Sequence, residues 1–163
     1  HRTHGTTTLF ASTVTEPIEK LERQLGVLRA LVEEGELAGI HLEGPFLAPE
    51  RKGAHDVGLL RDPDPESVGR LIAAGGPALK MITMAVEREH GEAATRRFVE
   101  AGVHVAFGHS DADDVTTARS IEWGADVVTH LFNAMRPIHH REPGPIPVVL
   151  SASGSTVRRA WTS

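Results

Sequence analysis

Three side chains that can bind a metal ion stand at the ends of apolar stretches of the sequence. Glu43 lies next to the end of "GIHLEG", His109 ends "VHVAFGH", and His130 lies near the end of "DVVTHLF". Two imidazoles and one carboxylate with an open fourth position form a catalytic site for zinc or a similar divalent metal. The twofold alternation of a β-strand aligns each of them with neighbours on one face: Glu43 with His41, His109 with Val103, Val105 and Phe107, and His130 with Asp126 and Val128.

A structural role is the alternative for each of these residues taken alone. A single histidine at a strand end is more often a hydrogen-bonded structural residue than a ligand. Glu43 could cap a loop, although a carboxylate at an apolar strand end costs several kcal/mol unless it has a partner. Asp111 and Asp113 open a helix in "HSDADD", where acidic residues favour the first turn, so helix capping is predicted for both. The segment "HREPGP" alone is typical of a proline-stiffened loop with Arg141 in solvent.

Strand and helix patterns alternate along the chain and explain how these residues could meet. Apolar and β-branched runs predict five strands, and periodic segments between them predict four helices, one with Asp64 at its cap. Such alternation implies parallel strands with helical crossovers, either doubly wound or part of a (β/α)8 barrel, whose sites lie at the C-terminal strand ends. The expected strands are 5–13, 36–44, 78–86, 103–109 and 126–132, and the expected helices are 16–35, 64–76, 91–102 and 110–125.

Chain length limits the barrel interpretation. A closed (β/α)8 barrel takes about 250 residues and eight strands, whereas this chain has 163 residues. We therefore expect a partial, TIM-like α/β barrel of about five βα units, with an incomplete catalytic domain over residues 1–150. The segment "SASGSTVRRAWTS" shows neither strand alternation nor a helical stripe, so residues 151–163 form an unassigned tail. The edges of 5–13 and 126–132 are then expected to be open.

Composition excludes several classes of function. Hydrophobic residues make up 40% of the chain, which is typical of a globular domain with a real core. The net charge is −5 with scattered basic residues, so neither nucleic acid nor an anionic membrane is an expected partner. The absence of cysteine excludes thiolate chemistry and suits the cytoplasm. No membrane span or signal peptide is predicted.

Three longer motifs carry a resemblance to a known family. The segments are "GIHLEGPFLAPERKGAH", "GHSDAD" and "THLFNAMRPIHHREPG", with "HRTHGTTTLFAST" ahead of them. Together they resemble the N-acetylglucosamine-6-phosphate deacetylase family of the amidohydrolase superfamily, over residues 1 to about 149. The resemblance, rather than the spacing, indicates the substrate class. It implies hydrolysis of the acetamide of N-acetylglucosamine 6-phosphate to glucosamine 6-phosphate and acetate, in amino-sugar catabolism.

The resemblance also implies roles for single residues. Glu43, His109 and His130 would bind the catalytic metal, with zinc expected and iron as the alternative. The substrate contacts would come from two loops, with Ala54 and His55 on one and Asn133 and Ala134 on the other. Arg141 would reach the substrate phosphate, whose geometry suits a guanidinium group, across the interface of a homodimer.

Two parts of the family pattern have no counterpart in this sequence. The family's His-x-His strand lies ahead of the first residue here, and its catalytic aspartate lies on a strand beyond "HHREPG". We therefore expect the isolated chain to be inactive or nearly so, because general acid and base catalysis contributes roughly 10²- to 10⁴-fold. Two alternatives stay open: another amidohydrolase acting on an amide or cyclic amide, and a non-catalytic fragment that acts as a binding piece.

Overall fold

Strands and helices alternate along the chain in the computed structural model, which describes residues 2–152 and 158–160. The order is β1 (Phe10–Thr13), α1 (Ile18–Glu33), β2 (Gly39–Glu43), α2 (Pro65–Gly75), β3 (Leu79–Met84), α3 (Gly91–Glu100), β4 (His104–Phe107), α4 (Asp114–Trp123), β5 (Val127–Thr129), α5 (Pro145–Ser151) and β6 (Arg158–Ala160). Short 3₁₀ turns cover Arg2–His4, Pro49–Arg51, Val57–Leu59 and Gly76–Ala78. The predicted βα alternation is confirmed.

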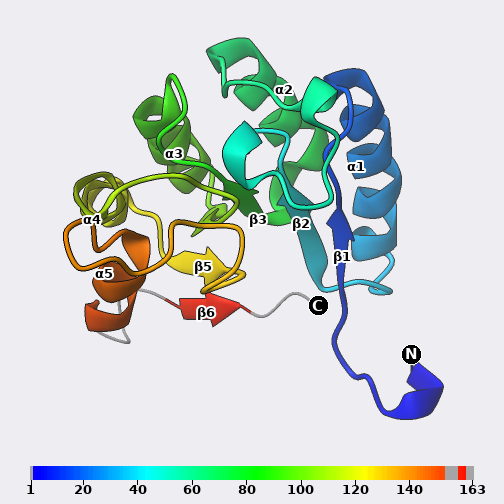
Figure 1. Ribbon diagram of the computed structural model, residues 1–163. Coiled ribbons are helices and arrows are strands. Elements are labelled where there is room, and N and C mark those ends of the chain that lie inside the picture. The colour runs from blue at the N-terminus through cyan, green and yellow to red at the C-terminus, as the bar shows by residue number, and fades with distance from the viewer. Residues whose placement is uncertain (1, 153–157, 161–163) are drawn as a thin grey trace.

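All strands belong to one parallel sheet in which each strand pairs with the next one in sequence. The order is β1-β2-β3-β4-β5-β6, with no strand inserted between sequence neighbours. A doubly wound sheet reverses its strand order at a switch point, whereas successive parallel neighbours are the arrangement of a (β/α) barrel. Figure 1 shows the helices in an arc around the outer side of the strands. The partial-barrel alternative is therefore confirmed.

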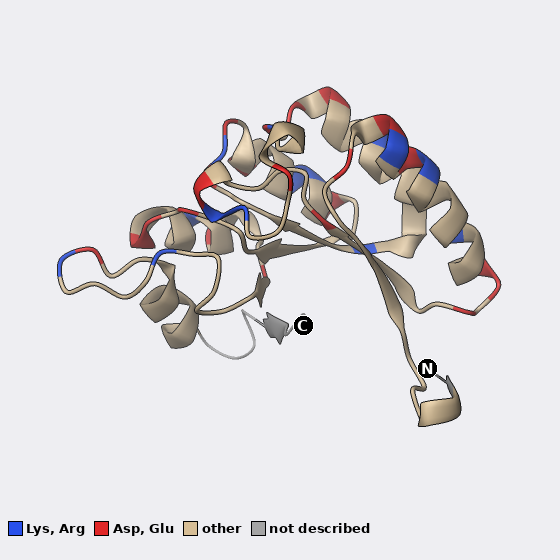
Figure 2. Ribbon diagram, turned by 45° about the vertical axis from the view of Figure 1, so that its right-hand side comes forward, with Lys and Arg blue, Asp and Glu red and all other residues tan. Residues whose placement is uncertain are grey.

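The main apolar core lies between this sheet and its helices. Alternate residues of the strands, such as Ile40 and Leu42 of β2, are fully buried there. They pack with residues of α1, α2 and α3, for which Leu21, Leu71 and Phe98 stand as examples. Charged residues of both signs lie mainly on the helices and loops (Figure 2). Apolar residues at twofold spacing on the strands and at helical spacing on the helices thus pack in one layer. This packing determines which strand side chains face the helices and which face away from them.

Two helices begin at aspartate caps. Asp64 accepts a hydrogen bond from the Ser67 backbone N–H at 2.9 Å, and Asp113 accepts one from Thr116 N–H at 2.7 Å. Each carboxylate satisfies one of the free N–H groups of the first helical turn. The prediction for Asp111 is wrong, because its carboxylate accepts hydrogen bonds from two arginine side chains instead of capping α4.

Two predicted boundaries change in the structure. Only Phe10–Thr13 of the expected strand 5–13 pair with β2, and among the described residues β1 forms one edge of the sheet. Residues 145–151 form α5, and residues 158–160, within the segment left unassigned, form β6 parallel to β5. The sheet thus has six strands rather than five, and the expectation that 126–132 is an open edge is wrong. In the part of the chain that the structure describes, no helix has the length and apolar character needed to cross a membrane.

Candidate metal centre

The structure brings Glu43, His109 and His130 together at the C-terminal edge of the sheet. Glu43 is the last residue of β2, whereas His109 and His130 follow β4 and β5. Nε2 of His130 lies 2.6 Å from Oε1 of Glu43, and Nε2 of His109 lies 3.4 Å from the same oxygen. The two imidazole rings meet edge to face with their centroids 4.8 Å apart. One carboxylate oxygen therefore faces two imidazole nitrogens.

The two histidines reach this position through left-handed backbone rather than through strand alternation. Val105 and Phe107 of β4 pack in the apolar clusters with residues of the helices, so strict alternation would send His109 to that side as well. His109 and His130 instead have φ values of 49° and 53°, in a region that non-glycine residues rarely adopt. The backbone turns sharply after each strand and points both rings toward Glu43. The predicted alignment of His109 with Val105 and Phe107 is therefore wrong, although the three side chains do converge.

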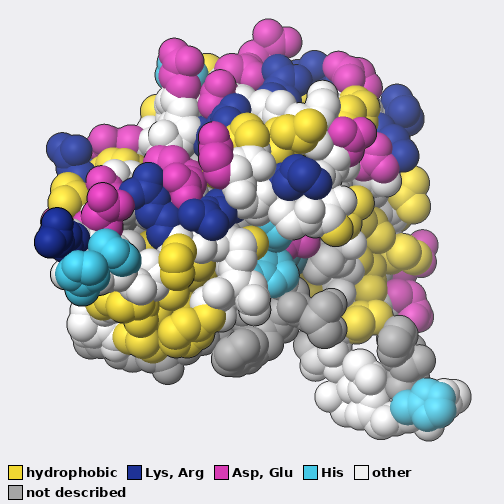
Figure 3. Space-filling view, viewed as in Figure 1, with side chains coloured by type: hydrophobic (Ala, Val, Ile, Leu, Met, Phe, Trp, Pro, Cys, Tyr) yellow, Lys and Arg dark blue, Asp and Glu magenta, His cyan; other side chains and the backbone are white. Residues whose placement is uncertain are grey.

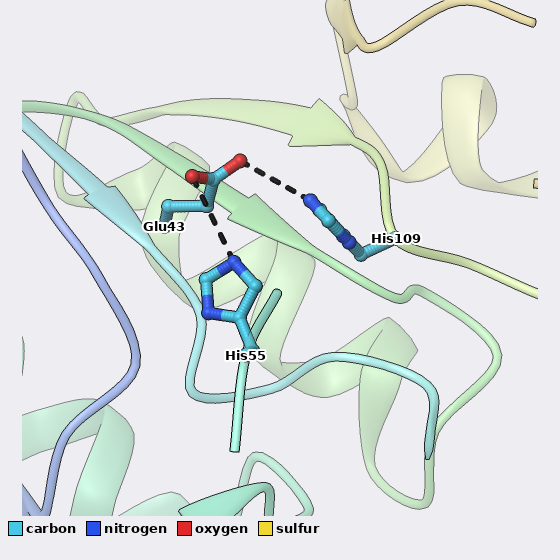
Figure 4. Close-up of side chains that lie close together, drawn as sticks. All are labelled: Glu43, His55 and His109. Carbon is cyan, nitrogen blue, oxygen red and sulfur yellow. Dashed lines mark ion pairs between the residues drawn. The ribbon is translucent and has the colours of Figure 1, made fainter. Parts of the chain in front are cut away.

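His55 joins this cluster from the loop after β2. Its Nε2 lies 3.8 Å from Oε2 of Glu43, and its ring centroid is 4.9 Å from that of His109. Figure 4 shows Glu43 between the two imidazoles, one facing each carboxylate oxygen. Glu43, His55 and His109 offer metal-binding atoms that all lie within 4.8 Å of one another. Distance alone would therefore admit His55 as a fourth ligand.

His55 and His109 differ in the hydrogen bond that each makes through Nδ1, on the side of the ring away from Glu43. Nδ1 of His109 lies 2.8 Å from the Arg51 carbonyl oxygen, which can only accept, so Nδ1 carries the proton and the neutral ring keeps its Nε2 lone pair for a cation. Nδ1 of His55 instead accepts from the Thr15 backbone N–H at 3.4 Å. Neutral His55 then carries its proton on Nε2 and acts as a donor. His109 is therefore suited to bind a metal through Nε2, whereas His55 is suited to donate a hydrogen bond from Nε2.

The charge of the cluster suits a cation. Burial raises the pKa of Glu43, but hydrogen bonds with His109 and His130 outweigh it and lower this pKa to about 2. Burial lowers the pKa of His55, so this ring stays neutral more readily. Burial also opposes the charging of His109, yet the hydrogen bonds to Glu43 and the Arg51 carbonyl raise its pKa. A half-buried carboxylate that stays ionised beside imidazole nitrogens is the donor set that a divalent metal requires.

A chain of polar side chains, buried except for Ser12, lies on the same face of the sheet as Glu43 and was not predicted. His41 contacts Ser12 Oγ through Nδ1 at 3.0 Å and Thr83 Oγ1 through Nε2 at 2.8 Å. Thr83 Oγ1 lies 3.3 Å from Thr129 Oγ1. Thr83 faces Glu43 in the β2–β3 register, and Thr129 directly precedes His130. Polar residues at alternate positions of otherwise apolar strands were the signal in the sequence.

The residues expected to contact a substrate occupy two loops near this centre. Ala54 is exposed beside His55, and Asn133 is exposed in the loop after β5. The Asn133 N–H donates to the His130 carbonyl at 2.6 Å, and the Ala134 carbonyl accepts from Ser110 N–H at 3.2 Å. Histidine side chains are visible near the middle of the face drawn in Figure 3, with acidic and basic side chains close by.

Arg141 makes no hydrogen-bond contact with the candidate metal ligands among the described residues. It lies in the exposed loop between β5 and α5, where its backbone N–H donates to Nδ1 of His139 at 3.3 Å. Among the described residues, no hydrogen bond or ion pair joins it to Glu43, His109 or His130. Its expected role at a phosphate therefore stays a prediction.

No protein-family model matches the chain. The N-acetylglucosamine-6-phosphate deacetylase of Lysinibacillus sphaericus is 39% identical to it over 150 residues, which are 90% of this chain and 39% of that protein. The N-acetylgalactosamine-6-phosphate deacetylase of Escherichia coli O157:H7 is 32% identical over 161 residues, covering 96% of this chain and 41% of that protein.

Solved structures agree in fold and in sequence. N-acetyl-D-glucosamine-6-phosphate deacetylase from Mycobacterium smegmatis matches with a TM-score of 0.92 and 48% identity, over 96% of this chain and 41% of that chain. A mutant of the same enzyme in complex with N-acetyl-D-glucosamine-6-phosphate matches equally well, with 40% of its chain covered. The chain thus spans about two fifths of the length of these relatives.

Proposed function

We propose that this chain, a homologue of one segment of the N-acetylglucosamine-6-phosphate deacetylases, is the metal-binding part of a hydrolase that removes the acetyl group from a phosphorylated amino sugar. The observation that supports this most strongly is the approach of the Nε2 atoms of His109 and His130 to one carboxylate oxygen of Glu43. The similarity to the Mycobacterium smegmatis enzyme, which extends over 96% of the chain, supports the same interpretation.

The metal would be held by Glu43, His109 and His130, and zinc is the proposed ion, with iron as the alternative. Zinc commonly takes imidazole and carboxylate ligands and keeps a fourth position open in catalytic sites. Such an ion, when bound, polarises an amide carbonyl and lowers the pKa of its water toward about 7. The fixed Nδ1–H of His109 supports this ligand role, because metal-binding histidines generally donate their second N–H to a neighbouring acceptor.

The remaining site residues would bind and orient the sugar. His55 would donate from Nε2 toward the carbonyl oxygen of the acetamide, since its Nδ1 is engaged by Thr15. Ala54, Asn133 and Ala134 would line the sugar site from the two exposed loops. Arg141 would bind the phosphate of a substrate held by the second subunit of a homodimer. This role would explain why Arg141 makes no hydrogen bond with the metal centre of its own chain.

N-acetylglucosamine 6-phosphate is the proposed substrate, and the cytoplasm, where sugar phosphates are kept, is the proposed location. The relative from Escherichia coli O157:H7 is named for the galactosamine epimer, so the configuration at C4 of the sugar is a separate question. The two epimers share the acetamide and the phosphate, on which Glu43, His109, His130 and Arg141 would act. Both sugars therefore belong in the assay.

The decisive experiment is a chimera in which this chain replaces the corresponding 41% of the Mycobacterium smegmatis enzyme. The chimera should release acetate from N-acetylglucosamine 6-phosphate, and the same chimera with His109→Ala should not. A folded, zinc-loaded chimera that hydrolyses neither epimer but cleaves another amide would support the different amidohydrolase. One that binds the sugar phosphate without any turnover would favour the binding piece.

A further inference from the structure

Asp111 joins two arginines that come from different loops around the metal centre. Its Oδ1 accepts a hydrogen bond from Arg51 Nε at 2.8 Å, and a second guanidinium nitrogen of Arg51 lies 2.8 Å from the same oxygen. Its Oδ2 accepts from Arg136 at 3.0 Å. Arg51 belongs to the loop after β2, Asp111 to the loop after β4 and Arg136 to the loop after β5. One carboxylate therefore connects the three loops that carry the candidate ligands and substrate contacts.

Backbone hydrogen bonds hold the turn that bears Asp111 against the same two loops. The His109 carbonyl accepts from Ala48 N–H at 2.9 Å, and Ser110 N–H donates to the Ala134 carbonyl at 3.2 Å. Below the turn, the carboxylate of Glu87 accepts from Ser110 Oγ and from Asp111 N–H, both at 2.6 Å. These hydrogen bonds hold the backbone of Asp111 in place, so its side chain is directed toward the two arginines.

Arg51 links this ion-pair network to the imidazole of His109. The side chain of Arg51 binds Asp111, and its backbone carbonyl accepts the Nδ1–H of His109 at 2.8 Å. The turn that follows is in contact with the ring as well, since a Cβ atom at Gly53 would lie 2.9 Å from Cε1 of His109. A shift of the Pro49–Arg51 turn would therefore remove the acceptor of Nδ1 and change the space beside the ring.

We propose that Asp111 is a positioning residue, which holds Arg51 so that its carbonyl fixes the His109 tautomer with Nε2 directed at Glu43. The proposal rests on the proposed metal function of His109. It makes Asp111 the outer member of a chain of contacts that runs from Asp111 through Arg51 to His109. Outer-shell partners of metal-bound histidines typically change metal affinity roughly 10- to 100-fold when they are removed.

If Asp111 served only as part of a surface ion pair, its loss would change neither metal affinity nor the hydrogen bond of His109. The side chains of Asp111, Arg51 and Arg136 are 25%, 30% and 36% exposed, and exposed pairs of this kind contribute little to stability. Loss of Asp111 should thus change the melting temperature only slightly. If the residue acts through Arg51, the effect appears in metal affinity and in the His109 ring instead.

The test compares Asp111→Asn with Asp113→Asn in the full chain. Asp113 lies two residues away and caps α4, and asparagine caps a helix as well as aspartate does, so Asp113→Asn is the matched control. Zinc affinity is measured by competition with a chelating dye. NMR detection of the His109 imidazole N–H, which the Arg51 carbonyl protects from exchange with water, gives a second readout without zinc.

Asp111→Asn should weaken zinc binding roughly tenfold and speed the exchange of the His109 N–H, whereas Asp113→Asn should match the wild type in both. Arg51→Ala should behave like Asp111→Asn although its backbone carbonyl is retained. Equal exchange rates of the His109 N–H in the wild type and all three variants would overturn the positioning role. Equal losses of zinc affinity in Asp111→Asn and Asp113→Asn would overturn it as well. Failure of the wild type to bind zinc would contradict the metal proposal, and the exchange rates would still decide the role of Asp111.

Discussion

Oε1 of Glu43 and Nε2 of His130 lie 2.6 Å apart although 87 positions separate the two residues in sequence. The contact spans the sheet from β2 to β5, and it exists because parallel strands deliver their C-terminal ends to one edge. The same oxygen lies 3.4 Å from Nε2 of His109. At 2.6 Å, the Glu43 oxygen and His130 Nε2 share a hydrogen bond, and a divalent cation held between the three side chains would take the place of that proton.

This arrangement predicts which substitutions remove metal binding. Glu43→Gln and His109→Ala should each reduce bound zinc to a small fraction of the wild-type stoichiometry, because each takes away a charged or lone-pair donor. His55→Ala should keep the stoichiometry, since Thr15 N–H occupies Nδ1 and leaves a proton on Nε2. Elemental analysis of the purified proteins measures all three. Loss of zinc in His55→Ala equal to that in His109→Ala would make His55 a ligand.

Much of the fold and the location of the site could be predicted from the sequence. The alternation of apolar strands with amphipathic helices is a local signal, and it located β2, α2 and β4 to within a few residues. The ligand candidates Glu43, His109 and His130 followed from their positions at strand ends. That rule works because parallel strands deliver their C-terminal ends to one edge of the sheet, so it does not require any distance to be known.

The remainder depends on contacts that no local pattern contains. The left-handed φ of His109 and of His130 belongs to the turns that follow β4 and β5, whereas β-alternation predicts the opposite side of the sheet. Asp111 stands where helix-capping residues are common, so its bridge between Arg51 and Arg136 required the three loops to be placed first. β6 is recognisable only through its pairing with β5, because the three residues Arg158–Ala160 show no strand pattern of their own.

Gly108 is predicted to be essential for the polar chain on the inner face of the sheet. A Cβ atom there would collide with Thr129 Oγ1 and lie 2.9 Å from Thr83 Cγ2, the two residues whose hydroxyls meet beside this position. Gly108→Ala should therefore lower the free energy of unfolding by about 1–3 kcal/mol. Gly26→Ala is the control, because a Cβ atom at this exposed position in α1 meets no atom within 4 Å, and it should stabilise the helix by about 0.5–1 kcal/mol. Urea denaturation measures both, and a neutral Gly108→Ala would show that the hydroxyl pair can move apart.

Glu87 should make the stability of the chain fall as the pH rises. Burial raises the pKa of Glu87 above its ordinary value of 4.5, and hydrogen bonds from Ser110 and the Asp111 N–H only partly offset this. The folded state therefore holds the proton to a higher pH than the unfolded state does. The stabilising contribution is complete below about pH 4.5 and is lost as the pH rises through the folded pKa.

Glu87→Gln removes this titration while keeping groups that can bond to Ser110 and to Asp111 N–H. Relative to the wild type, the variant should gain stability as the pH rises above about 4.5, as measured by urea denaturation at each pH. A difference between the two proteins that stays constant over this range would show that the Glu87 carboxyl titrates normally. Glu89→Gln serves as the control, because its side chain is 75% exposed.

Arg141 should matter for the phosphate of the substrate and for little else. The residue is exposed and makes no ion pair with the metal centre among the described residues, so its substitution should leave folding and zinc content unchanged. In the active chimera, Arg141→Ala should raise KM for N-acetylglucosamine 6-phosphate roughly 10- to 100-fold, as expected for loss of a charged hydrogen bond of about 1.5–3 kcal/mol. Its effect on unphosphorylated N-acetylglucosamine should be within about twofold, because that substrate offers no phosphate partner. Arg96→Ala, which removes an exposed arginine paired with Glu92 on α3, should leave both KM values unchanged. Steady-state kinetics with the two sugars separates the outcomes, and an equal rise in KM for both would make Arg141 a structural residue of its loop.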